Sequence, residues 1–349
     1  FLTLIAAFSV GLTACQTAPT STAESSNTGQ SKEATTGMPG KGLKVRPSAL
    51  SSPERLFFAE IIGIGLEKLG YDVEEIRQLG PTLSHTAVSN GDLDFYIPHL
   101  NKSHEQFFEK GGGEQKLERV GDLLPRVLVE GYSIDRKTAE QHKITDLGQL
   151  KEPQIAQLFD SDGDGKANLA GCDVGHACEK TIDRHLKAYG LQNTVEHNKG
   201  KISVLFADVL ARYQQGQPVL FYTYSPSWLD YKLENGKDTV WLPVPFTALP
   251  EGQKNFTEKD TLFEGKNLGF LVNQMQVVAN KTFVEDNPAA KRWIEQVQIP
   301  LEDLVAQFQR IAEGEDSPQD VRRHAEEWVK NNQQQVDRWL EEAKKAASN

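Results

Sequence analysis

"SSPERLFFAEIIGIGLEKLG", residues 51–70, is the stretch that decides the fold class, because it has the length and the end signals of a helix. Ser52 can cap the first turn, and Gly70 can end the last one. Strand-like segments flank this helix, "GLKVRPSAL" at 42–50 and "YDVEEIRQL" at 71–79. A helix between two strands is typical of a mostly parallel sheet with helices on both faces, so the stretch predicts an α/β protein.

The same alternation continues along the chain and forms two groups. A short helix at 82–91 and the strand "DLDFYIP" at 92–98 complete the first group. The second group begins near "VLVEGYSIDRKTA" at 127–139, and it includes a helix at 179–190 and the strand "PVLFYTY" at 218–224. Two such groups predict two α/β lobes, and a ligand cleft is expected between the lobes.

The composition excludes several classes of function. A chain of 349 residues suits two domains of ordinary size. Its net charge of −11 argues against a nucleic-acid partner, which would require a basic surface. After residue 15 no segment approaches the roughly 20 apolar residues that span a bilayer. Membrane contact is therefore expected only through the start of the chain.

The first residues are typical of a bacterial lipoprotein. "FLTLIAAFSVGLTAC" is apolar and ends in "LTAC", which looks like a lipobox, so we expect lipidation of Cys15 and removal of residues 1–14 as a signal peptide truncated at its start. An ordinary signal segment with a chance cysteine is the alternative. Residues 15–41 are rich in Ser, Thr, Ala and Gly and are expected to form a flexible tether. This predicts a lipid-anchored protein at the periplasmic or extracellular face of the cytoplasmic membrane.

The stretch "AGCDVGHACEK" at 170–180 contains the other two cysteines, with a histidine between them. The oxidising compartment outside the membrane favours a disulfide between Cys172 and Cys178. A zinc site that also includes His176 lacks a convincing fourth ligand. A catalytic Cys–His pair is the third interpretation, and it would require a free thiolate.

The folded part of the chain resembles the glycine betaine/proline betaine-binding proteins of osmoprotectant ABC importers. The resemblance runs from about residue 40 to the C-terminus. It is based on long stretches in the same order, above all "DRKTAEQHKITDLGQLKEPQIAQLFDSDGDGKANLAGC" at 135–172, "KDTVWLPVPFTALP" at 237–250 and "VVANKTFVEDNPAAK" at 277–291. It implies a type II periplasmic-binding-protein fold, with lobe 1 formed by 42–128 plus 245–349 and lobe 2 by 129–244.

In function, the resemblance implies an extracytoplasmic lipoprotein that captures a small zwitterionic osmoprotectant and delivers it to the ABC permease, acting as a monomer. No reaction is implied, and the chain lacks a G-x-S-x-G nucleophile motif, so we expect no enzyme. The alternative is the same fold binding another carboxylate-bearing solute, or serving as a sensor without transport.

The resemblance also implies particular site residues. It places Cys172 and Cys178 at the family's disulfide. The helix after Cys178 puts the amides of Ala177 and Cys178 at a helix N-terminus, which favours an anion, and the family binds the ligand carboxylate there. The matching histidine of the other lobe is His104 in "LNKSHEQ".

The cation half of the site departs from the family pattern. A quaternary ammonium is usually held by an aromatic cage, and the family's three tryptophan positions correspond here to Leu100, His176 and Tyr224. One account keeps a betaine ligand and brings in another aromatic ring, with Tyr96, Tyr222 and Trp228 as candidates. The other account replaces the betaine by a carboxylate-bearing solute with N–H or O–H groups.

The loop "DSDGDGKANLAG" at 160–171 begins like an EF-hand calcium loop. Its twelfth position is Gly171 instead of glutamate, although Asp173 could supply the missing carboxylate. The alternative is an Asp/Gly turn without metal. No other cofactor is expected. The candidate ligands for a structural calcium ion are Asp160, Asp162, Asp164 and the carbonyl of Lys166.

Overall fold

The structure is a computed structural model that describes residues 37–348. The predicted signal peptide at 1–14, Cys15 and nearly all of the predicted tether lie outside the described residues. Within the described part, no helix is both long enough and apolar enough to cross a membrane.

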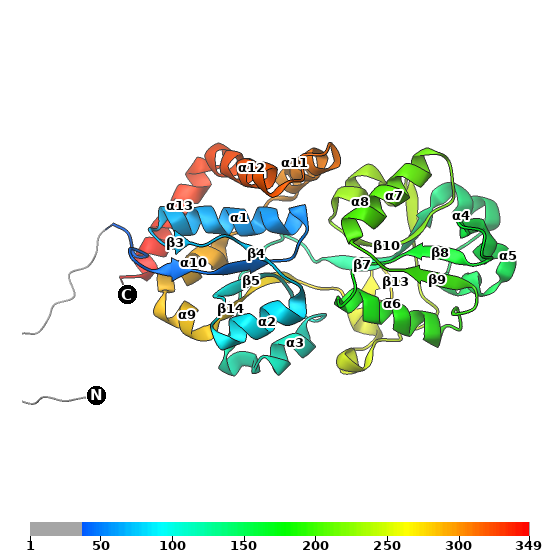
Figure 1. The fold of residues 1–349 in the computed structure, drawn as a ribbon, viewed down its shortest axis with the longest axis horizontal. Coiled ribbons are helices and arrows are strands. Elements are labelled where there is room, and N and C mark those ends of the chain that lie inside the picture. The colour runs from blue at the N-terminus through cyan, green and yellow to red at the C-terminus, as the bar shows by residue number, and fades with distance from the viewer. Residues whose placement is uncertain (1–36, 349) are drawn as a thin grey trace, which may run out of the picture. The chain divides into compact units, whose positions relative to one another are not determined.

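Two five-stranded sheets form the centres of two lobes (Figure 1). Two small sheets, each of two strands, accompany them: β1 (Lys44–Val45) with β3 (Asp72–Val73), and β12 (Leu262–Phe263) with β13 (Lys266–Asn267). The strands of the first large sheet, in spatial order, are β4 (Arg77–Gln78), β2 (Pro47–Ala49), β5 (Phe95–Leu100), β14 (Met275–Asn280) and β6 (Leu117–Val120). Those of the second are β11 (Thr239–Leu242), β7 (Val129–Asp135), β10 (Leu220–Ser225), β8 (Ala167–Ala170) and β9 (Val195–Asn198).

Helices cover both faces of each sheet. In the first lobe α1 lies on one face and α2 and α3 lie toward the other, and in the second lobe α7 and α8 lie opposite α6 (Figure 1). The predicted α/β architecture is therefore confirmed. The α-helices are α1 (Pro53–Lys68), α2 (Pro81–Asn90), α3 (Glu105–Lys110), α4 (Arg136–His142), α5 (Pro153–Ala156), α6 (Ala177–Ala188), α7 (Ile202–Gln214), α8 (Trp228–Lys232), α9 (Lys281–Asp286), α10 (Pro288–Gln296), α11 (Leu301–Ala312), α12 (Pro318–Asn331) and α13 (Gln333–Ala346).

The expectation of mostly parallel sheets is confirmed, because four of the five strands in each large sheet point the same way, but each sheet also contains one antiparallel strand that the sequence did not predict. In the first sheet β14 runs antiparallel to both β5 and β6, and in the second sheet β7 runs antiparallel to both β10 and β11. Both strands follow a crossing between the lobes. The chain enters each of these strands from the other lobe instead of from a covering helix, which reverses the strand direction. Local helix and strand signals carry no information about such long-range crossings.

The two crossings pair with each other at one point. The backbone N–H of Leu128 donates to the carbonyl of Asn273 at 2.7 Å, and the N–H of Asn273 donates back to the carbonyl of Leu128 at 2.9 Å.

The predicted lobe boundaries stay a prediction. Beyond residue 245, Phe270 still packs against the rings of Tyr132 and Tyr222 in the second sheet.

Helix α1 has the predicted position but not the predicted cap. It begins at Pro53 and is followed by Gly70, whose φ of +94° favours glycine. The Ser52 side chain makes no capping hydrogen bond, and its hydroxyl is buried without a partner among the described residues. Pro53, which has no N–H to satisfy, is therefore the effective start signal.

Close packing between α1 and α10 depends on Gly65. Trp293 is fully buried against this helix and donates from Nε1 to the carbonyl of Ile62 at 2.9 Å. A Cβ atom at Gly65 would lie 1.9 Å from the Trp293 ring, whereas a Cβ atom at Gly63 would meet nothing nearer than Val73 at 3.8 Å. The indole ring therefore requires glycine at position 65 and not at position 63.

A chain of hydrogen bonds from the half-buried Arg119 to two buried histidines joins β6, β5 and α2. The Arg119 Nε–H donates to His99 Nε2 at 3.1 Å, so a neutral His99 carries its proton on Nδ1. That proton points at His85 Nε2, 2.9 Å away, and His85 Nδ1 in turn lies 2.7 Å from the Pro81 carbonyl. Each imidazole has one donor and one acceptor in use, and both rings are therefore fixed in the neutral form.

We expect Gly65→Ala to lower the free energy of unfolding by roughly 1–3 kcal/mol or more, because the new methyl group overlaps the Trp293 ring. Gly63→Ala is the matched control in the same helix. It should raise the free energy of unfolding by up to roughly 1 kcal/mol through helix propensity. Urea unfolding of both variants checks the difference in sign. Equal changes at the two positions would contradict the described packing.

A second prediction concerns acid stability. Burial lowers the pKa of His85 to about 4, so between pH 6.5 and 4 the unfolded chain binds a proton that the native protein excludes. The native state therefore loses stability as the pH falls, by roughly 2 kcal/mol for this residue between pH 7 and 5.

His85→Gln retains one donor and one acceptor but cannot titrate. The variant should show a smaller loss of unfolding free energy than the unmodified protein when urea unfolding is compared at pH 7 and pH 5. The exposed His142, changed to Gln, is the control and should leave the pH dependence unaltered. An unchanged pH dependence in His85→Gln would show that this ring is not buried in the neutral form.

Candidate ligand-binding site

One cavity lies where the two lobes meet, beside the crossing at Leu128, and side chains from both sheets line it. It brings together all six ligand-binding residues predicted from the sequence. They come from β5 and the turn after it, from the end of β10, and from the start of α6. The six residues are Leu100, His104, His176, Ala177, Cys178 and Tyr224.

The start of α6 forms one side of the cavity. Ala177 is the first residue of this helix, so the N–H groups of Ala177 and Cys178 have no acceptor within the helix. Both residues line the cavity. Free amides and the positive end of the helix dipole make this side favourable for a carboxylate.

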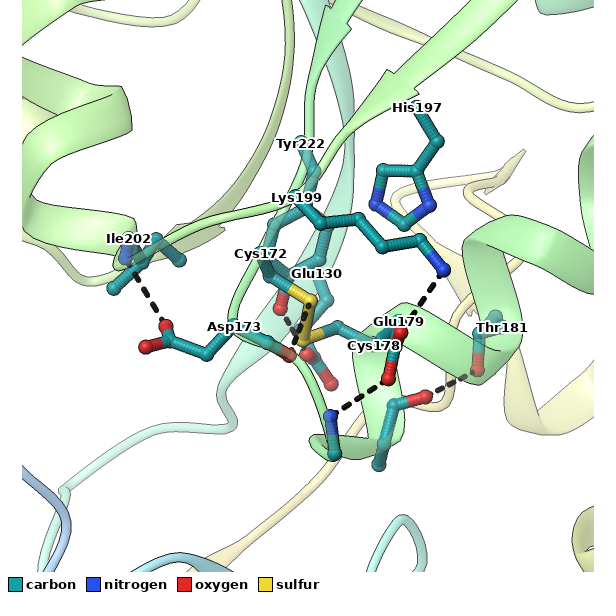
Figure 2. Close-up of a disulfide and its surroundings, with 12 residues drawn as sticks. Glu130, Cys172, Asp173, Cys178, Glu179, Thr181, His197, Lys199, Ile202 and Tyr222 are labelled. Carbon is teal, nitrogen blue, oxygen red and sulfur yellow. Dashed lines mark hydrogen bonds and ion pairs between the residues drawn. A yellow bond between two sulfur atoms is a disulfide. The ribbon is translucent and has the colours of Figure 1, made fainter.

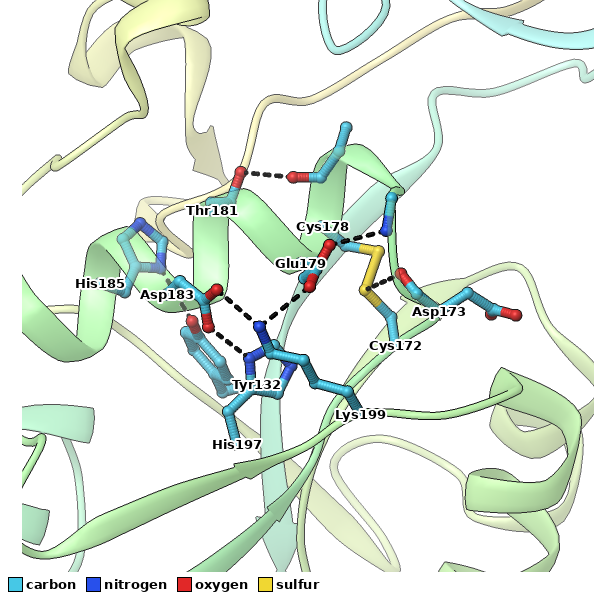
Figure 3. Close-up of polar contacts among 12 residues, drawn as sticks. Tyr132, Cys172, Asp173, Cys178, Glu179, Thr181, Asp183, His185, His197 and Lys199 are labelled. Carbon is cyan, nitrogen blue, oxygen red and sulfur yellow. Dashed lines mark hydrogen bonds and ion pairs between the residues drawn. A yellow bond between two sulfur atoms is a disulfide. The ribbon is translucent and has the colours of Figure 1, made fainter. Parts of the chain in front are cut away.

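Covalent and ionic contacts hold the start of α6 in place. The predicted disulfide joins Cys172, just after β8, to Cys178 in the first helical turn (Figure 2). The Lys199 ammonium, just after β9, donates to Glu179 at 2.9 Å and to Asp183 at 2.7 Å, both on α6 (Figure 3). The amides of α6 are therefore fixed relative to two strands of the second sheet.

His104 faces this helix start from the first lobe. Its Nδ1 accepts a hydrogen bond from the backbone N–H of Leu100 at 3.2 Å, so the neutral ring carries its proton on Nε2. Burial, together with the nearby His85 and His176, lowers the pKa of His104 well below its usual value. The ring is a neutral N–H donor at physiological pH, suited to a ligand carboxylate.

The three predicted cage positions all line the cavity, with different chemistry. Leu100 is half-buried and aliphatic. Tyr224 presents an aromatic ring with a hydroxyl group, and its O–H donates to Glu54 at 3.4 Å. His176 is half-buried, and burial lowers the pKa of its imidazole, so this ring becomes protonated only at a lower pH than an unperturbed histidine.

The three aromatic rings considered as replacements in the cage lie in different places relative to the cavity. Tyr222 lines the cavity, but its hydroxyl is bonded to the Glu130 carboxylate. Tyr96 is fully buried in a separate cluster with Val88, and Trp228 packs against Phe206. Neither Tyr96 nor Trp228 lines the cavity, so Tyr222 is the only one of the three candidates that reaches it.

Two charged residues that sequence reasoning missed also line the cavity. Arg55 belongs to the first turn of α1 and is 4% exposed, and Glu130 belongs to β7 and is 8% exposed. Arg55 follows a glutamate in a first helical turn, which is typical of an exposed surface. Glu130 interrupts the otherwise apolar strand "VLVEGYSI" at 127–134, and that polar residue was a signal of a functional position.

The Glu130 carboxylate is oriented by neighbouring donors. It accepts hydrogen bonds from the Tyr222 hydroxyl and from the Asn273 amide at 3.4 Å (Figure 2 shows Glu130 and Tyr222). Burial raises the pKa of Glu130 to about 7, although Tyr222 and the positive charge of Arg55 oppose this shift. Near neutral pH this carboxyl group is therefore partly ionised.

The Asp-rich loop meets the calcium criteria only in part. The carboxylates of Asp160, Asp162 and Asp164 lie within 4.8 Å of one another, but they accept hydrogen bonds from backbone N–H groups of the same loop. Asp173 accepts from the Ile202 N–H at 3.0 Å and lines the ligand cavity, so it does not complete the loop. A calcium ion with the Lys166 carbonyl as a further ligand stays a prediction.

Comparison with known proteins agrees with this geometry. Residues 44–331 match the model of the family described as "Substrate binding domain of ABC-type glycine betaine transport system". The chain is 42% identical over 310 residues to the glycine betaine-binding periplasmic protein OusX of Dickeya dadantii, covering 89% of this chain and 92% of that protein. It is also 42% identical over 306 residues to the glycine betaine/proline betaine-binding periplasmic protein of Escherichia coli, with 88% and 92% covered.

Solved structures support the same fold at lower identity. The glycine betaine, L-proline-binding protein ProX of Borrelia burgdorferi aligns with a TM-score of 0.67 and 16% identity over 87% of this chain and 99% of that one. A lactococcal OpuAC in its closed, glycine betaine-bound form aligns with a TM-score of 0.63 and 16% identity over 85% and 99%. The fold is thus that of a two-lobed type II periplasmic binding protein, and the chain belongs to the family of substrate-binding domains of ABC-type glycine betaine transport systems.

Proposed function

We propose that this protein captures a small zwitterion of the glycine betaine type outside the cytoplasmic membrane and delivers it, as a monomer, to the permease of an ABC importer. The relatives named for glycine betaine favour this ligand class over other carboxylate-bearing solutes and over a sensor without transport. The activity is reversible binding, and no catalytic step is required.

The observation that supports this function best is the meeting of His104 with the start of α6 in one cavity. Neutral N–H donors from both lobes converge there: the His104 ring from the first lobe, and the amides of Ala177 and Cys178 from the second. A carboxylate bound between them would join the lobes. In these hydrogen bonds only the acceptor, the ligand carboxylate, would carry a charge. The protein therefore needs no buried charge of its own at the α6 end of the cavity.

The predicted lipid anchor gives the protein its location. We propose that Cys15 carries the lipid and that residues 16–41 connect it to the folded part. A tether of this composition would let the binding lobes move between free solution and the permease at the same membrane surface.

His104→Ala should weaken glycine betaine binding by about 1–3 kcal/mol, which corresponds to a roughly 5- to 150-fold higher dissociation constant, because one hydrogen bond to the carboxylate is lost. Isothermal titration calorimetry measures the change. His142→Ala, an exposed histidine outside the cavity, is the matched control and should bind like the unmodified protein. Unaltered affinity in His104→Ala would mean that the carboxylate does not bind there.

The anchor is tested separately. In bacteria that produce and export the protein, mass spectrometry should find the mature chain starting at a lipid-modified Cys15. Cys15→Ser should move the protein from the membrane fraction to the soluble fraction, because the acyl chains provide the membrane affinity. A membrane-bound Cys15→Ser variant would rule out this anchor.

A further inference from the structure

The Arg55 guanidinium lies over the ring of Tyr224, with 5.1 Å between the guanidinium carbon and the ring centroid. Tyr224 is the aromatic ring that remains at the three predicted cage positions. The same ring also packs against Phe206, with 5.7 Å between the centroids. The space at this ring that a ligand cation would use is therefore taken by groups of the protein itself.

Arg55 has no acceptor of its own in the described part of the chain. Between residues 37 and 348, no carboxylate forms an ion pair with its guanidinium, and no side-chain hydrogen bond from it is found, although the residue is only 4% exposed. Two acidic groups beside Tyr224 and Tyr222 are engaged elsewhere: Glu54 accepts from Tyr224, and Glu130 accepts from Tyr222 and Asn273. A buried arginine without an ion pair that lines a cavity points to a role in ligand binding.

We propose that Arg55 determines which solutes the cavity accepts, because its guanidinium occupies the position on Tyr224 where the quaternary ammonium of the ligand would bind. The inference rests on the proposed function. A quaternary ammonium and a guanidinium cannot share one ring face, and their like charges repel more strongly in a cavity than in water. A betaine therefore binds only when Arg55 moves away from the ring.

The cavity contains a group that can receive the displaced arginine. Glu130 lies close enough for the positive charge of Arg55 to lower its pKa, and both residues line the same cavity. Arg55 has a long, flexible side chain and stands in the first turn of α1, so rotation about its side-chain bonds is enough to move the guanidinium from the ring toward this carboxylate. The ligand cation and Arg55 thus compete for Tyr224 within reach of the Glu130 carboxylate, and Glu54 and Asp173 add further negative charge near the same ring.

Two probes of equal shape test the proposal. Glycine betaine carries a trimethylammonium group, and 3,3-dimethylbutanoate has a neutral tert-butyl group in its place with the same carboxylate. Arg55→Met removes the guanidinium but retains an unbranched apolar side chain and a good helix former. In calorimetry this variant should bind glycine betaine at least about tenfold more tightly, while the affinity for 3,3-dimethylbutanoate should not rise by more than about threefold.

Arg55→Lys is the matched control, because it retains the positive charge. It should bind glycine betaine more weakly than Arg55→Met does, and thermal unfolding verifies that both variants are folded. If Arg55→Met loses affinity for both probes, Arg55 binds the ligand carboxylate and the proposal is wrong. Equal affinities for glycine betaine in the unmodified protein and in Arg55→Met would overturn this inference but leave the proposed function standing. If neither form binds glycine betaine at millimolar concentration, the proposed function fails and the inference fails with it.

Discussion

The side chain of Asn273 connects the turn before His104 to Glu130 at the crossing between the lobes. Its Oδ1 accepts from the backbone N–H groups of Lys102 and Ser103, at 3.1 and 2.9 Å. Its Nδ2 donates to the Ser103 hydroxyl and the Leu271 carbonyl, at 2.9 and 2.7 Å, with a longer contact to Glu130. The residue is fully buried at the crossing between the lobes, and the four shorter hydrogen bonds use both acceptor sites and both N–H protons of the amide, so the contact to Glu130 shares one of these protons.

This arrangement has a structural consequence. The turn with Lys102 and Ser103 leads directly into His104, and Glu130 is the second residue of β7. His104, the proposed donor to the ligand carboxylate in the first lobe, and Glu130 in the second lobe therefore both depend on the Asn273 amide. Each hydrogen bond left unmade in such a buried place costs about 1–3 kcal/mol, so the cavity side chains and the crossing are stabilised together.

The two ends of the cavity use different electrostatics. At the α6 end the donors are neutral, because the Leu100 amide keeps the His104 proton on Nε2 and the pKa of this ring is far below neutral pH. At the Tyr224 end the groups are charged or partly charged, with Arg55 and Glu130 both buried. Neutral donors avoid the desolvation cost of a buried charge, whereas the charged end is sensitive to what lies beside it.

Sequence reasoning found the α6 end because its features are local. The helix start at Ala177 and the cysteine pair lie within a few residues of each other, and the family resemblance added His104 from a distant segment. The aligned cage positions were placed at the cavity as well. Arg55 and Glu130 were missed because a single sequence does not tell which side of a helix or strand meets the other lobe. The two antiparallel strands were missed because local helix and strand signals do not show where the chain crosses between the lobes.

The Tyr224 end is best described as an exchange of cations around Glu130. With Arg55 nearby, the positive charge lowers the pKa of Glu130 and favours its ionised form. A ligand ammonium at Tyr224 would have the same effect on that carboxyl group. A positive charge then compensates the Glu130 carboxylate both before and after the ligand binds. The contribution of the ligand cation to the free energy of binding is therefore the difference between its own interactions at Tyr224 and those of the displaced Arg55. Specificity at this end therefore depends on how well Arg55 is accommodated away from the ring, and the α6 end must provide most of the affinity.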